Sequence, residues 1–150
     1  MTREQRALVR ESWLRCQPTL REAGAQFYDR LFALDPGTRH LFAGTDMAEQ
    51  ERKLIGMFTE ILRMLDQPDE LVRDVTDLGR RHAHYGVKDR QYESVGAALL
   101  WTLELGLGEQ FTREVREAWT EAYLLAATLM RRGAGRASCP VSGERCSESP

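Results

Sequence analysis

Apolar residues recur at three- and four-residue spacing along nearly the whole sequence, and proline, glycine and aspartate interrupt this period at short intervals. No segment alternates apolar and polar residues for long enough to predict a strand. A chain of 150 residues with 42% apolar residues can bury one core. The pattern therefore predicts an all-α fold in which helices pack on helices.

Capping and helix-breaking residues divide the sequence into six or more expected helices. Thr2 can cap the first helix with Gln5 as its capping-box partner, and Pro18 should interrupt it. Further helices are expected over residues 19–34, 38–41, 47–65, 69 or 74 to 84, 88–107 and 109–132.

The segment 133–150 differs from the rest of the chain because it is small, polar and proline-containing. We expect it to be a disordered tail, which leaves residues 1–132 as one folded domain. Two of the three cysteines, Cys139 and Cys146, lie in this segment. Solvated thiols are the simplest interpretation, and a regulatory disulfide is the alternative.

Charge patterning gives no sign of a nucleic-acid or membrane partner. The formal net charge is -2, and no block of like charges occurs. The charged N-terminus has no apolar signal-peptide core, and no apolar run approaches the roughly 18 residues of a membrane span. We therefore expect a cytoplasmic protein with reduced thiols.

Two histidines, His82 and His84, stand two positions apart near the end of an expected helix. Val75, Leu78 and His82 share one helix face, whereas His84 lies about 200° around the helix from His82. His82 should therefore face the core and His84 the solvent. An inward imidazole either binds a metal or donates to a backbone carbonyl as an ordinary core histidine.

Two further polar side chains fall on apolar helix faces. Gln50 extends the stripe that Leu54 begins, and either Tyr28 or its neighbour Phe27 must face the core. The simple alternatives are that Gln50 reaches solvent at the helix end and that the Tyr28 hydroxyl is wet. Together with His82, these groups would surround a space that suits a metal-bound diatomic ligand.

Six short segments follow one another in a characteristic order within residues 4–132. They are FYDRLF (27–32), HLF (40–42), EQERKL (49–54), GRRHAHYGV (79–87), YESVGAALLWTL (92–103) and AWTEAY (118–123). In this order and spacing they resemble the globins, most closely the bacterial flavohaemoglobins and single-domain haemoglobins. The resemblance implies the globin fold, a sandwich of helices around haem b.

The resemblance also implies a site. His82 matches the proximal ligand of the haem iron, and Tyr28 and Gln50 match the distal pair that acts on a bound gas. Lys53 matches a partner of a haem propionate, with a solvated surface residue as the alternative. The other residues expected to contact the cofactor are Phe42, Leu54, Leu78, Val87, Tyr92 and Val95.

A tyrosine and a glutamine beside the gas imply slow release of dioxygen, because each hydrogen bond contributes about 1–3 kcal/mol. Slow release favours oxidation of nitric oxide to nitrate. The alternatives are a non-enzymatic dioxygen carrier, a haem-based gas or redox sensor, and a globin-like protein without a cofactor. Residues 130–136 contain no acid where flavohaemoglobins present a glutamate, which argues against peroxidase-like chemistry.

The expected partners follow from the same resemblance. They are dioxygen, nitric oxide and carbon monoxide as diatomic ligands, together with a separate reductase, because the flavin and nicotinamide domains of flavohaemoglobins are absent from this sequence. We expect a monomer or a homodimer.

Overall fold

The computed structural model describes residues 1–137, and helices are the regular elements throughout that part of the chain. The prediction of an all-α fold is therefore confirmed. The six α-helices are α1 (Arg3–Cys16), α2 (Leu20–Leu34), α3 (Met47–Arg63), α4 (Pro68–His84), α5 (Gln91–Leu107) and α6 (Arg113–Ala137). Short 3₁₀ helices connect them, namely η1 (Gln17–Thr19), η2 (Pro36–Phe42), η3 (Met64–Asp66) and η4 (Gly108–Gln110).

Several helix ends lie where the sequence chemistry predicts them. The Gln5 N–H donates to Thr2 Oγ1 at 3.1 Å and the Thr2 N–H donates to Gln5 Oε1 at 2.9 Å, which completes the capping box of α1. Pro68 opens α4, where a missing N–H loses no helical hydrogen bond. Gly86, with a φ of +95°, follows the end of α4 in the left-handed conformation that glycine favours.

Two predicted boundaries are wrong. Helix α5 begins at Gln91 rather than Lys88, because the Lys88 N–H donates to Gln91 Oε1 at 2.7 Å and residues 88–90 form a turn. Helix α6 begins at Arg113, after a Thr112 hydroxyl that accepts from the Val115 N–H at 3.2 Å.

The end of α6 also differs from the prediction. The helix continues to Ala137, so residues 133–137 extend α6 instead of beginning a disordered tail. The remainder of that predicted tail, with Cys139 and Cys146, lies outside the described residues.

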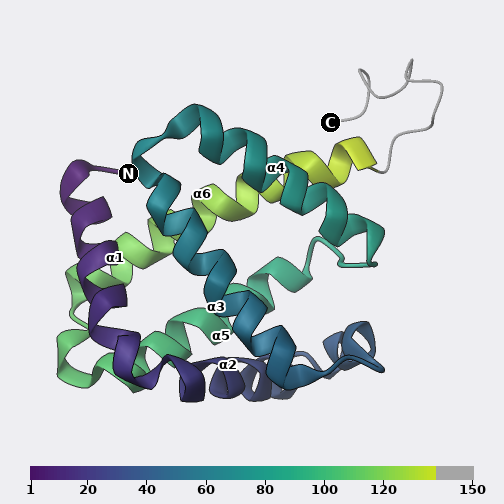
Figure 1. The fold of residues 1–150 in the computed structure, drawn as a ribbon, viewed down its shortest axis with the longest axis horizontal. Helices are drawn as coiled ribbons and strands as arrows, with labels where there is room; N and C mark the ends of the chain where they lie inside the picture. The colour runs from purple at the N-terminus through teal and green to yellow at the C-terminus, as the bar shows by residue number, and fades with distance from the viewer. Residues whose placement is uncertain (138–150) are drawn as a thin grey trace.

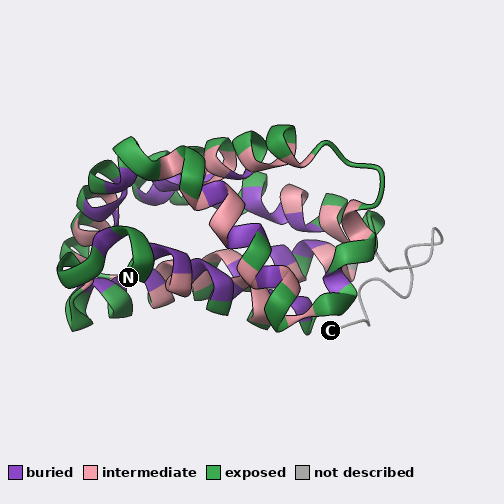
Figure 2. Ribbon diagram, turned by 90° about the horizontal axis from the view of Figure 1, so that it is seen from below, coloured by how far each residue is buried: buried purple, intermediate pink, exposed green. Residues whose placement is uncertain are grey.

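Figure 1 shows two helix pairs on opposite sides of the molecule, α2 with α5 and α4 with α6, while α3 runs obliquely between these sides. Helix α1 packs against α6 at the end away from the C-terminal part of α4. Figure 2 shows that buried residues lie on the inward faces of these helices. No helix within residues 1–137 combines the length and hydropathy that a membrane span requires.

The consecutive helices α3 and α4 rest on different partners, since α3 packs on α2 and α4 packs extensively on α6. Glycine permits close approach in both pairs. A Cβ atom on Gly24 of α2 would lie 3.0 Å from the Glu51 Cβ of α3. A Cβ atom on Gly79 of α4 would lie 2.0 Å from the Met130 carbonyl oxygen of α6. The two helices are therefore seated on opposite sides of the interior.

A buried hydrogen bond joins α1 to α6. The Trp119 Nε1–H donates to Ser12 Oγ at 2.8 Å, and the two residues are 2% and 1% exposed. The Ser12 hydroxyl in turn donates to the Leu8 carbonyl at 2.7 Å. Both polar groups are thus satisfied inside an apolar core.

We expect Ser12→Ala to lower the free energy of unfolding by about 1–3 kcal/mol, because the buried indole N–H loses its acceptor. Thr59→Ala is the matched control, since this exposed hydroxyl donates only to the Ile55 carbonyl of its own helix. Urea unfolding followed by circular dichroism measures both. Equal midpoints for Ser12→Ala and the unsubstituted protein would contradict the assignment.

Candidate functional site

His82 lies near the C-terminal end of α4, with its ring on the inner face of the helix, while His84 is exposed, as the periodicity predicts. The His82 Nδ1–H donates to the Leu78 carbonyl at 2.9 Å. Burial lowers the pKa of His82, although the hydrogen bond to Leu78 acts in the opposite direction. The ring is therefore a neutral imidazole with its proton on Nδ1, and the Nε2 lone pair is available to a metal.

The turn after α4 fixes the backbone of this histidine. The Val87 N–H donates to the His82 carbonyl at 3.0 Å, and the left-handed Gly86 allows the chain to fold back in this way. The backbone groups of Leu78 and Val87, both predicted to contact the cofactor, thus form hydrogen bonds with His82.

Tyr28 on α2 and Gln50 on α3 meet across the α2–α3 contact. The Gln50 Nε2–H donates to Tyr28 Oη at 3.2 Å, and Tyr28 is only 4% exposed. Burial raises the pKa of Tyr28, opposed by the hydrogen bond from Gln50, so the phenol stays protonated. Within the described residues no group accepts the hydroxyl proton of Tyr28, so this proton is available to a ligand.

Aromatic rings enclose the Tyr28 phenol. The ring centroids of Phe27, Phe32 and Phe42 lie 5.0, 6.0 and 5.2 Å from that of Tyr28. Phe42 also contacts Phe32, with 5.7 Å between centroids, at the end of η2. Sequence reasoning identified Phe42 but missed Phe32, although the four-residue spacing of Tyr28 and Phe32 on one helix was a signal.

Tyr92 on α5 brings a second phenol into the interior. It is 6% exposed, and its buried hydroxyl has no hydrogen-bond partner among the described residues. The Arg131 guanidinium lies 5.3 Å from the ring centroid, and the Tyr123 hydroxyl donates to the Tyr92 carbonyl. An unpaired buried hydroxyl is costly, so its position suits contact with a group that the protein itself does not supply.

The remaining predicted residues divide into two groups. Leu54 is buried on α3 and Val95 is half-buried on α5, as apolar wall residues should be. Lys53 is instead exposed, and its Nζ lies 3.9 Å from the Glu49 carboxylate on the same helix. The structure does not bring Lys53 to the buried groups, and its role as a propionate partner stays a prediction.

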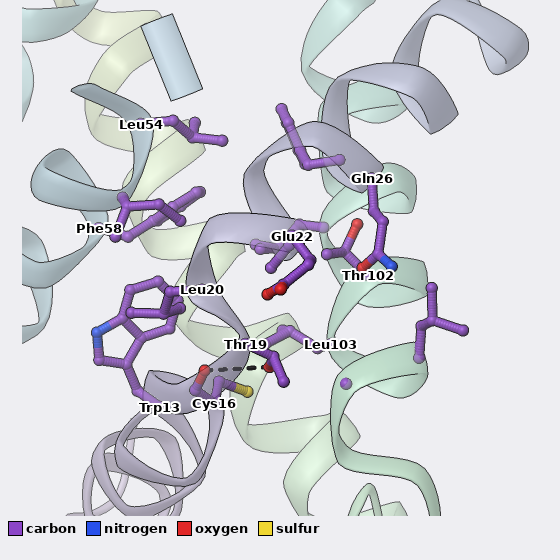
Figure 3. A pocket seen from close by; sticks show the side chains of 16 residues that line it. Trp13, Cys16, Thr19, Leu20, Glu22, Gln26, Leu54, Phe58, Thr102 and Leu103 are labelled. Carbon is purple, nitrogen blue, oxygen red and sulfur yellow. Dashed lines mark hydrogen bonds between the residues drawn. The ribbon is translucent and has the colours of Figure 1, made fainter. Parts of the chain in front are cut away.

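A separate apolar cleft of about 250 Å³ opens between α1, α2, α3 and α5 (Figure 3). Leu54 and Phe27 form part of its wall, but His82, Tyr28 and Gln50 do not line it. Cys16 lies at its edge, where burial raises the pKa of the thiol. The other residues shown in the figure include Trp13, Thr19, Leu20, Glu22, Gln26, Phe58, Thr102 and Leu103.

Comparison with known proteins identifies the family. The family model described as Globin matches residues 25–129, more than half of the chain. The chain belongs to the globin family. This globin is 28% identical to the neuroglobin of Tetraodon nigroviridis and 27% identical to that of Danio rerio. Each alignment covers 89% of this chain and 92% of the relative.

A solved structure supports the fold. The crystal structure of a hexacoordinated heme protein from an anhydrobiotic tardigrade at pH 4 superposes with a TM-score of 0.81 over 89% of this globin and 95% of that chain. At 18% sequence identity the likeness concerns the fold alone. The curated relatives are vertebrate neuroglobins, so the expected place in the bacterial flavohaemoglobin branch is not supported.

The family implies a haem, and the residues of this globin fit one. His82 offers the Nε2 lone pair, Tyr92 carries an unpaired buried hydroxyl, and Tyr28 has a proton without an acceptor. These groups come from α4, α5 and α2, while α3 and α4 are seated on different partners. An imidazole that can ligate iron and a free hydrogen-bond donor for a bound gas are groups that a gas-binding haem site uses.

We expect the Tyr28 phenol to ionise only above its ordinary pKa of about 10, since burial disfavours the phenolate. The carbon-13 shift of labelled tyrosine Cζ in the carbon monoxide complex, assigned with Tyr28→Phe, measures this. Because the pKa of Tyr28 is higher in the folded protein than in the unfolded chain, the protonated phenol stabilises the folded state below about pH 10. This contribution to the free energy of unfolding is lost as the pH rises past about 10. Gln50→Leu should move the ionisation of Tyr28 to still higher pH, because the hydrogen bond from Gln50 lowers the pKa of the phenol. Ionisation of Tyr28 below about pH 10 would refute the assignment of a buried phenol.

Proposed function

We propose that this globin binds haem b through His82, holds dioxygen tightly beside Tyr28, and oxidises nitric oxide to nitrate with electrons from a separate reductase in the cytoplasm. One observation carries the proposal. The Gln50 amide donates to the Tyr28 oxygen at 3.2 Å inside an aromatic shell, so the phenol proton itself is left to donate to a ligand.

Haem would be held by His82 and would supply an iron that binds a diatomic gas. In a dry setting, the preorganised O–H donor of Tyr28 would stabilise partial negative charge on a bound gas. Gln50 strengthens this donor, because a phenol oxygen that accepts a hydrogen bond gives its own proton more readily. Tyr28 would therefore be the donor to the gas, and Gln50 would act through Tyr28.

The proximal side supports gas binding over peroxidase-like chemistry. His82 shares its Nδ1 proton with the neutral Leu78 carbonyl, and a carbonyl cannot take that proton as a carboxylate can. Arg131, a cation, lies over the Tyr92 ring and pairs with Asp89 at 2.7 Å. No step of the proposal therefore depends on an anionic imidazole.

We expect His82→Ala to abolish stable haem retention, because the Nε2 ligand is lost. Gel filtration of the haem-loaded protein, followed by the Soret absorbance per protein, measures retention. The matched control is His84→Ala, two residues along the same helix and exposed, which should retain haem. Normal haem content in His82→Ala would overturn the proximal assignment.

We expect the double variant Tyr28→Phe with Gln50→Leu to release dioxygen about tenfold faster or more, at about 1–3 kcal/mol per lost hydrogen bond. Displacement of dioxygen by carbon monoxide in a stopped-flow instrument gives the rate. Gln50→Leu alone should have the smaller effect, because Tyr28 keeps its proton. Tyr85→Phe, at an exposed tyrosine, is the control.

The same dioxygen complex tests the reaction. Mixed with nitric oxide it should yield nitrate in proportion to haem, and repeated turnover should need an added flavin-dependent reductase. Fast dioxygen release without nitrate formation would instead indicate a reservoir, and a ligand-dependent change in self-association would indicate a sensor.

A further inference from the structure

Helices α4 and α6 touch through their backbones at two reciprocal points. A Cβ atom at Gly79 would lie 2.0 Å from the Met130 carbonyl oxygen and 2.4 Å from its Cα. A Cβ atom at Gly133 would lie 1.8 Å from the Thr76 carbonyl oxygen and 2.9 Å from the Arg80 nitrogen. These distances are far below the roughly 3.5–4.0 Å of ordinary contact, so no side chain fits at either position.

This contact lies shortly before His82 along α4. Thr76 and Gly79 are one turn apart on α4, and His82 is one turn further, about 4.5 Å along the axis. The Leu78 carbonyl, which accepts the His82 Nδ1 proton, is adjacent to Gly79. A displacement of α4 from α6 would therefore move both the imidazole and its hydrogen-bond acceptor.

The same turn of α6 holds the chain that follows α4. The Arg131 Nε lies 2.7 Å from the Asp89 carboxylate in the turn before α5, and the Arg131 guanidinium lies 5.3 Å from the Tyr92 centroid. Residues 130–133 thus contact the chain both before His82 in the sequence, at Thr76 and Gly79, and after it, at Asp89 and Tyr92. Backbone contacts transmit displacement more directly than flexible side chains, because packed interiors compress little.

We propose that Gly79, Gly133 and Arg131 are positioning residues that determine the position of His82 Nε2 relative to the haem iron. The proposal rests on the proposed ligation by His82. A methyl group at either glycine must push α4 from α6 by about 1 Å, since Cβ contacts under 3.0 Å do not occur. Loss of Arg131 releases the turn after α4 without a steric clash.

The test compares Gly79→Ala, Gly133→Ala and Arg131→Ala as ferrous haem-loaded proteins. Resonance Raman gives the iron–histidine stretching frequency, flash photolysis gives the carbon monoxide association rate, and thermal melting gives stability. We expect all three variants to shift the frequency and to change the association rate by about threefold or more.

Two matched controls separate positioning from stability. Ser12→Ala weakens the packing of α6, but through its contact with α1, because the Trp119 Nε1–H loses its acceptor. Arg116 pairs with Glu104 at 3.0 Å and lies 4.9 Å from the Phe111 centroid, as Arg131 does with its partners, but in the N-terminal half of α6. Ser12→Ala and Arg116→Ala should lower the melting temperature and leave the iron–histidine frequency unchanged.

The outcomes are distinct. If the glycine variants do not fold by circular dichroism, Arg131→Ala and Arg116→Ala decide the test. An iron–histidine frequency that is the same in Arg131→Ala and in the unsubstituted protein, or equal shifts in test and control variants, would overturn the positioning role. Haem retention by His82→Ala would instead refute the ligation on which the proposal rests.

Discussion

The site depends on the separation of two consecutive helices. α3, with Gln50, and α4, with His82, are joined by η3, yet each packs on a different helix. Gly24 allows α2 to approach α3, and Gly79 and Gly133 allow α4 to lie on α6. Because the two helices are seated separately, Gln50 is held beside Tyr28 of α2, while His82 is carried by the helix that packs on α6.

The polar groups themselves follow one physical rule. A buried donor or acceptor without a partner is costly, and this chain bears that cost at Tyr92 and leaves the Tyr28 proton without an acceptor. Within the described residues the Trp13 indole nitrogen is also buried without a hydrogen-bond partner, whereas that of Trp119 donates to Ser12. The Tyr28 and Tyr92 hydroxyls are the groups that the proposed haem and its bound gas would contact.

The comparisons agree on the family and disagree with the expected branch. The curated relatives are vertebrate neuroglobins, whereas the motifs resemble bacterial flavohaemoglobins. The tardigrade protein is described as hexacoordinated. In this globin α3 carries no histidine, and Gln50 on this helix donates to Tyr28. The place in the bacterial branch therefore stays a prediction.

The sequence by itself determined the helices and the inward side chains. The capping box at Thr2, the break at Pro68 and the direction of His82 depend on a few neighbouring residues, so periodicity and caps were enough to predict them. The Leu78 carbonyl was predictable as the partner of His82 for the same reason, since it lies one turn back on the same helix.

The tertiary structure alone decided the hydrogen bond from Gln50 to Tyr28, the Phe32 contact and the end of α6. Glycine disfavours a helix by about 1 kcal/mol per residue, so the local sequence Gly-Ala-Gly from Gly133 predicts a tail rather than a helix. It is helical here because the bare backbone at Gly133 packs on Thr76, a contact between residues far apart in the sequence. Local propensity contains no information about such a partner.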